Sequence, residues 1–72
     1  MNEPRWIKFV EVGKERNKPV FGVFNKGKGT PLGVVQWFSR WNCYIFSPEP
    51  ETIYSEDCLR DIAAFCAEKK MP

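Results

Sequence analysis

The chain contains no histidine and only three cysteines, and these shortages exclude several kinds of site. Without a histidine or a CxxC pair, a zinc site lacks both its imidazole ligands and its usual thiolate spacing. Catalytic triads also need a histidine or a comparable base beside the nucleophile. A phosphate loop needs a glycine-rich turn before a helix, and the sequence has no such turn. We therefore expect no metal site, no cofactor, no small-molecule substrate and no enzymatic activity.

The cysteines, Cys43, Cys58 and Cys66, are odd in number and too irregularly spaced for a disulfide framework. Cys58 and Cys66 lie in a predicted helix, which separates them by about 12 Å along its axis, beyond disulfide reach. The sequence also has no apolar run of membrane-spanning length and no signal-peptide pattern. These features predict a reduced, cytoplasmic protein without a membrane partner, whose cysteines are small core residues.

Aromatic side chains, in contrast, are abundant and make up 15% of the 72 residues. A chain of this length buries only about 60% of the surface that its unfolded form exposes. Large rings supply the most burial per ordered residue, so we expect most of them in one small core. The predicted organisation is a single domain over residues 1–72, for which self-association would add useful burial.

Four short segments have the β-branched and aromatic content of strands, and turn-forming residues separate them. Short connections between successive strands favour antiparallel neighbours, so the sequence predicts a three- to four-stranded antiparallel β-meander. The predicted strands are residues 6–12, 20–25, 32–38 and 43–46. Residues 13–19 are predicted to form a charged loop, and Pro48 and Pro50 to end the sheet.

One helix is predicted over residues 56–69, after the meander. Ser55 is a suitable N-cap, and Tyr54 and Leu59 have the spacing of a hydrophobic staple. Apolar residues recur at three- and four-residue spacing and predict one buried stripe, formed by Cys58, Leu59, Ile62, Phe65 and Cys66. The expected fold is therefore α+β, with one C-terminal helix packed on one face of the sheet.

One helix covers one face of such a sheet, yet the third strand is apolar on both faces. Gln36 is the only polar side chain within this strand, so we expect its face outward and the face of Val35 and Trp37 against the helix. The outward side chains then predict an interaction surface, formed by Val34, Gln36, Phe38 and Trp41. Local burial by the N-terminal strand and the 47–54 loop is the alternative explanation of this apolar face.

Charge is unevenly distributed along the chain. Residues 1–40 contain eight Lys and Arg against three acidic residues, whereas residues 41–72 contain three against six. The strand loops are therefore basic, and the helix with its lead-in is acidic. Candidate nucleic-acid contacts on the basic segments are Lys8, Arg16, Lys26, Lys28 and Arg40.

Two functions are consistent with these patterns. In the first, the protein is an accessory nucleic-acid-binding module whose basic loops contact phosphates while sheet aromatics stack on bases. In the second, the uncovered apolar face of the sheet binds a second copy of the chain or another protein, with aromatic residues as anchors. A pI near 8.5 falls short of a strongly basic footprint and does not decide between them.

The second half of the sequence also carries a specific pattern of aromatic residues. The pattern is LGxVxWxxxWxxYxFxP at residues 32–48, then TxY at 52–54 and CLxxIxxF at 58–65. It resembles a family of small proteins of phages, prophages and bacterial mobile elements that has no established activity. The resemblance covers about half the chain and implies an accessory cytoplasmic role with nucleic acid or a host or phage protein. Members often have a basic residue where this chain has Asn42, which weakens a phosphate contact at that turn.

Overall fold

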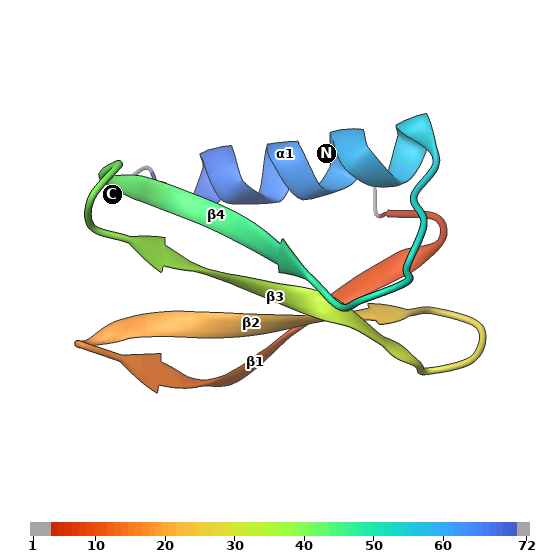
Figure 1. Ribbon diagram of the computed structural model, residues 1–72, viewed down its shortest axis with the longest axis horizontal. Coiled ribbons are helices and arrows are strands. Elements are labelled where there is room, and N and C mark those ends of the chain that lie inside the picture. Colours follow the sequence, from red (N-terminus) through yellow and green to blue (C-terminus); the bar gives the residue numbers. More distant parts are fainter. Residues whose placement is uncertain (1–3, 71–72) are drawn as a thin grey trace.

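The computed structural model describes residues 4–70 and shows a four-stranded antiparallel meander followed by one helix (Figure 1). The strands follow each other across the sheet in the order β1-β2-β3-β4. The elements are β1 (Ile7–Glu15), β2 (Lys18–Asn25), β3 (Pro31–Phe38), β4 (Cys43–Pro48) and α1 (Glu56–Lys70). The predicted α+β meander with a C-terminal helix is confirmed, with four strands.

The first hairpin is longer than predicted. Residues 13–19, expected as a charged loop, are mostly strand, because a bulge after Glu11 lets β1 continue to Glu15. The connection is only two residues, Arg16 and Asn17, with φ values of 52° and 67°. Two successive positive φ values are the mark of a type I′ hairpin turn, which matches the twist of the strands on either side. Trp6, expected to start the strand, lies before it and is exposed.

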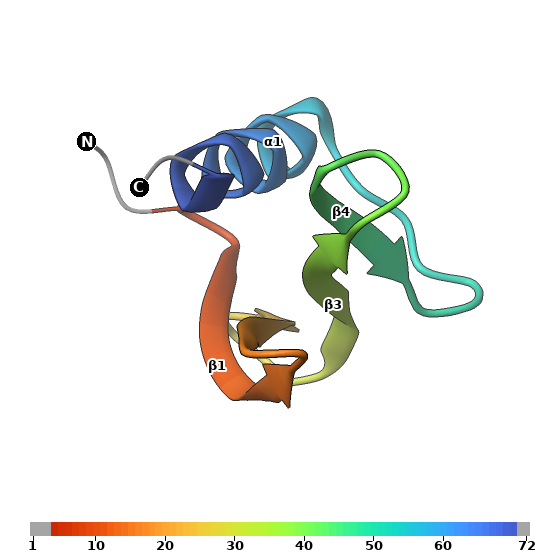
Figure 2. The same ribbon diagram turned by 90° about the vertical axis from the view of Figure 1, so that its left-hand side faces the viewer.

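The sheet curls into a trough, and α1 lies across its open side (Figure 2). The inner face of the trough and the helix enclose a small core, which among the described residues has six buried side chains: Ile7, Phe21, Val23, Val35, Tyr44 and Ile62. The ring of Phe65 on α1 stacks on Phe9 of β1 at a centroid distance of 3.9 Å and meets Phe21 of β2 edge-on at 4.9 Å. Phe65 therefore joins the helix to the first hairpin.

The start of α1 agrees with its predicted cap. The Ser55 hydroxyl accepts a hydrogen bond from the Cys58 amide at 3.3 Å, and the Ser55 carbonyl accepts one from the Leu59 amide at 3.0 Å. The predicted place of Leu59 in the buried stripe is wrong, because its side chain is 52% exposed. Tyr54 packs edge-on against Phe46, and its hydroxyl donates to the Leu32 carbonyl at 2.6 Å. Tyr54 thus anchors the lead-in segment on the sheet.

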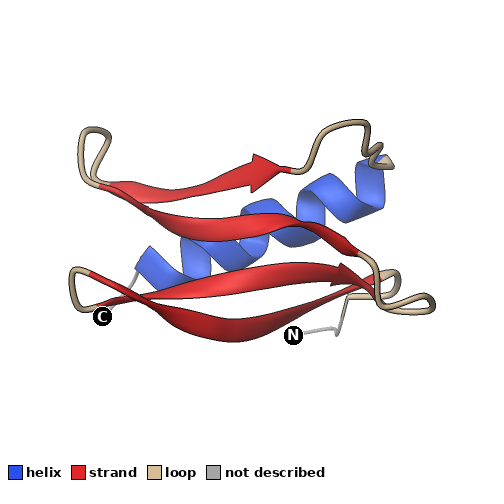
Figure 3. Ribbon diagram, turned by 60° about the horizontal axis from the view of Figure 1, so that its bottom comes forward, coloured by secondary structure: helices blue, strands red, loops and turns tan. Residues whose placement is uncertain are grey.

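The two hairpins separate toward one end of the sheet (Figure 3). The ladder between β2 and β3 ends at the pair Phe21–Val35. The ladders within the hairpins continue past this point, to Glu15–Lys18 in the first and to Phe38–Cys43 in the second. Pro19 lies where the β2–β3 ladder would continue, and proline has no amide hydrogen for a ladder bond. The gap that results lies between the turns of the two hairpins.

Candidate functional site

Six basic side chains gather at the end of the molecule where the hairpins separate. In a meander the first and third turns lie at the same end of the sheet, and α1 runs back so that its C-terminus also points to this end (Figure 1). All six are exposed: Lys14, Arg16, Lys18, Arg40, Lys69 and Lys70. We call these six residues the basic end. Within residues 4–70, none of the six forms a salt bridge.

The five basic residues singled out from the sequence do not form one patch. Arg16 and Arg40 belong to the basic end, but Lys26 and Lys28 are in the β2–β3 turn at the opposite end. Lys8 lies on β1, where it is paired with Phe24 of β2. The five residues are divided between the two ends of the sheet and β1, because successive turns of a meander point in opposite directions.

Lys26 has a structural contact that its charge alone does not reveal. Its ammonium group donates to the Pro4 carbonyl at 2.8 Å, and its amide donates to the Trp6 carbonyl at 2.9 Å. These two bonds hold the segment before β1 against the β2–β3 turn. The turn itself is ordered by the Asn25 side-chain oxygen, which accepts from the amides of Gly27 and Lys28 at 3.0 and 2.8 Å.

Four members of the basic end were not singled out from the sequence: Lys14, Lys18, Lys69 and Lys70. The two lysines of α1 lie in its last turn, where a positive charge complements the helix dipole. In the structure, the ammonium group of Lys69 also lies 5.2 Å from the ring centres of Phe21 and Phe65. A helix of fifteen residues is about 22 Å long, so its C-terminus returns to the end of the sheet from which β4 departs. The predicted length of the helix was therefore the feature of the sequence that could have placed Lys69 and Lys70 at this end.

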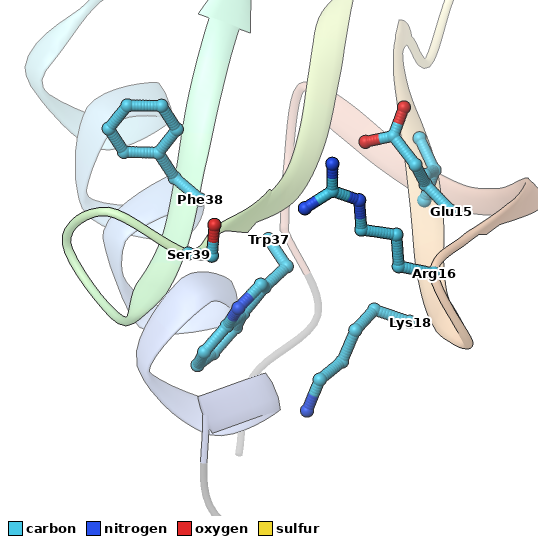
Figure 4. A pocket seen from close by; sticks show the side chains of 7 residues that line it. Glu15, Arg16, Lys18, Trp37, Phe38 and Ser39 are labelled. Carbon is cyan, nitrogen blue, oxygen red and sulfur yellow. The ribbon is translucent and has the colours of Figure 1, made fainter.

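A cleft of about 260 Å³ opens at the basic end, in the gap between the hairpins (Figure 4). The first hairpin contributes one wall and the end of β3 the other. Arg16 and Lys18 extend from the first hairpin toward Trp37, while the ring of Phe38 turns away. The ammonium group of Lys18 lies 4.6 Å from the centre of the Trp37 ring. The lining residues are Glu15, Arg16, Lys18, Val20, Trp37, Phe38 and Ser39.

The outer face of the sheet, opposite α1, carries the predicted interaction surface. The assignment of faces on β3 is confirmed, since Val35 is fully buried and Trp37 packs against the core. The alternate residues Val34, Gln36 and Phe38 are half-buried, and Trp41 packs edge-on against Phe38 at 4.9 Å. The exposed fractions of the apolar side chains at this surface are 43% for Val10, 56% for Val12 and 69% for Trp41. The structure thus brings the four predicted residues together and adds Val10 and Val12.

The three cysteines are half-buried, and none forms a disulfide with another described residue. Cys58 and Cys66 pack against the core, as expected. Burial raises the pKa of the Cys66 thiol above its ordinary value, and the nearby Cys43 raises it further. Cys66 is therefore a protonated, weakly nucleophilic thiol at neutral pH.

Residues 4–70 contain no group of three or more Cys, Asp or Glu side chains arranged to hold a metal ion. In the same part of the chain, α1 is too short and too polar to cross a membrane. No family model, curated protein or solved structure matches this chain. The resemblance to phage and mobile-element proteins therefore stays a prediction. The basic end and the outer face are the two candidate functional surfaces.

Proposed function

We propose that this protein is a small binding module without enzymatic activity that contacts the phosphates of nucleic acid through its basic end. The observation that carries the proposal is that six Lys and Arg side chains of the first hairpin, the β3–β4 turn and the C-terminal end of α1 lie at one end of the molecule. None of them has a carboxylate partner among residues 4–70. Only two carboxylates lie near them in these segments: Glu15 at the end of β1 and Glu68 in the last turn of α1. A reduced cytoplasmic setting and an accessory role in a phage or mobile element belong to the same proposal.

Such a surface predicts binding that is weak and strongly dependent on salt. Each phosphate neutralised by a Lys or Arg releases condensed counterions, so the logarithm of affinity falls with the logarithm of salt by about 0.9 per phosphate contact. With about four phosphates contacted, the slope is near −4. The dissociation constant expected at physiological salt is roughly 1–100 µM.

The double variant Arg16→Ala/Arg40→Ala tests the proposal. Removing two charges from the basic end is expected to weaken binding about tenfold at low salt and to reduce the salt slope by about 2. Fluorescence anisotropy with labelled 20-nucleotide DNA and RNA, over a salt series, measures both quantities. The charge-matched control is Lys8→Ala/Lys28→Ala, which removes two charges away from the basic end and is expected to retain most of the slope.

A turn variant separates loss of binding from loss of folding. Arg16 holds a positive φ that is unfavourable for a non-glycine residue, whereas Asn-Gly suits a type I′ turn. Arg16→Asn/Asn17→Gly is therefore expected to raise the free energy of unfolding by about 1 kcal/mol while it weakens binding. The proposed function would be contradicted if Arg16→Ala/Arg40→Ala and Arg16→Asn/Asn17→Gly bound as tightly as the wild type. Absence of binding by the wild type at low salt would contradict it as well.

The outer face supports a second candidate function, contact with a protein, including a second copy of the chain. Its support is the exposure of Val10 and Val12 on the sheet face that α1 leaves uncovered, together with the exposure of Trp41, which packs against Phe38 from the β3–β4 turn. Sedimentation velocity over a concentration range is expected to show a dimer that Val12→Lys shifts toward monomer, since the lysine places a charge in the contact. A wild-type monomer at all concentrations would contradict self-association through this face.

A further inference from the structure

The cleft at the basic end has two unlike walls, and the contrast indicates what fits between them. One wall offers the indole of Trp37, and the other offers the charged side chains of Arg16 and Lys18 (Figure 4). Ligand pockets for drug-sized molecules have volumes from about 300 Å³ upward, so a cleft of about 260 Å³ suits one small planar group. The cleft exists because the β2–β3 ladder ends at Phe21–Val35 and leaves a gap between the hairpins.

The indole of Trp37 is held in place but is not fully covered. Its ring meets Tyr44 edge-on at 5.4 Å, and Tyr44 belongs to the buried core. The Lys18 ammonium group lies over the ring face at 4.6 Å. A lysine on an exposed stem is a mobile cover, so a flat ligand can replace it without disturbing the sheet.

We propose that this cleft holds one unpaired nucleic-acid base, stacked on Trp37 in place of the Lys18 ammonium group. The inference rests on the proposed function, since the basic end brings the phosphates to the rim of the cleft. A base stacked on a tryptophan gains more than a solvent-exposed cation–π contact loses. The displaced ammonium group of Lys18 then lies near the phosphates that flank the base.

The remaining lining groups favour a base over a phosphate inside the cleft. Glu15 contributes a carboxylate, which repels a phosphate but accepts hydrogen bonds from the exocyclic amines of cytosine and adenine. The Ser39 hydroxyl can donate to a base edge or accept from it. In a duplex the bases are already stacked and paired, so a duplex cannot supply an unpaired base at this position. The cleft therefore makes the protein prefer single strands.

The test compares the affinity of the full chain for a single-stranded 12-nucleotide DNA and for a duplex of the same length, by fluorescence anisotropy at low salt. We expect the single strand to bind about tenfold more tightly. Trp37→Leu is expected to lower the affinity for the single strand about tenfold, to that of the duplex, and so to abolish this preference. The matched control is Trp41→Leu, which removes an equally large ring outside the cleft and is expected to keep the preference.

A direct NMR measurement on the wild-type protein tests the stacking site even if Trp37→Leu fails to fold. The indole N–H resonance of Trp37, assigned by its loss in Trp37→Phe, is expected to shift on titration with the single strand and to stay still with the duplex. Equal affinities for both DNAs with a steep salt slope would overturn the stacking site alone. Loss of the preference in Trp41→Leu instead of Trp37→Leu would overturn it as well. No binding of either DNA would overturn the stacking site and the proposed function together.

Discussion

Replacing Gly33 by alanine is expected to destabilise the protein by about 2–5 kcal/mol. Gly33 lies on β3 between Val23 of β2 and Pro48 of β4, with a φ of 158° that side-chain-bearing residues rarely adopt. An added Cβ would also clash with the backbone carbonyl oxygen of Ser47 and approach the Phe46 ring to 2.8 Å. A domain of this size has a total stability of about 4–11 kcal/mol, so this one methyl group removes a large part of it.

Thermal unfolding followed by circular dichroism measures this effect, and the melting temperature is expected to fall by at least about 10 °C. Gly22→Ala is the matched control, since Gly22 is also a buried glycine in the sheet. Its added Cβ would meet only side chains, the Phe24 ring at 2.6 Å and Val12 at 3.2 Å. These side chains lie on the outer face and can move, so the expected cost is about 1 kcal/mol. Equal losses at the two glycines would contradict the role assigned to the Ser47 carbonyl.

Ile62→Ala is expected to lower the free energy of unfolding by about 2–5 kcal/mol. Ile62 is the buried residue of α1, only 5% exposed, and belongs to the core formed with the inner face of the sheet. Alanine has a higher helix propensity than isoleucine, so helix formation alone would favour the variant. The loss therefore measures packing, and urea unfolding with an unchanged m value is the appropriate experiment.

Leu59→Ala supplies the contrast on the same helix. The two residues are three positions apart and have the same side-chain volume class, but Leu59 is 52% exposed. Its truncation is expected to cost about 0.5 kcal/mol or less. Similar losses at both positions would mean that Leu59 is covered in solution, for example by a partner on that side of α1.

The candidate site was predictable in part from the sequence. Arg16 and Arg40 follow from the charge of the predicted turns, and the outward face of Val34, Gln36 and Phe38 follows from strand alternation with the only polar residue placed outside. The site also depends on distances between segments that are far apart in the chain. The contact of Lys18 with Trp37 joins two hairpins across a gap, and no local pattern encodes that gap.

The length of the first hairpin was also not predictable from local sequence composition. Charged residues such as Lys14 and Glu15 indicate a loop by composition, yet they extend β1 as an edge strand. An edge strand tolerates charge, because one of its sides faces solvent. The tight turn at Arg16 and Asn17 then follows from pairing between the strands, although Arg-Asn is not the usual type I′ sequence.

The sequence by itself determined the order of elements, the antiparallel pairing and the capped start of α1, because short connections, strand propensity and the Ser55 cap act between near neighbours. Only the tertiary structure decided which apolar helix residues are buried and which basic residues meet. Ile62 and Leu59 are equivalent in the pattern, but Ile62 is buried in the core and Leu59 is exposed. The absence of histidine and the presence of only three cysteines can be read from the sequence alone. The convergence of six Lys and Arg residues beside an open indole, in contrast, depends on the summed packing of all five elements.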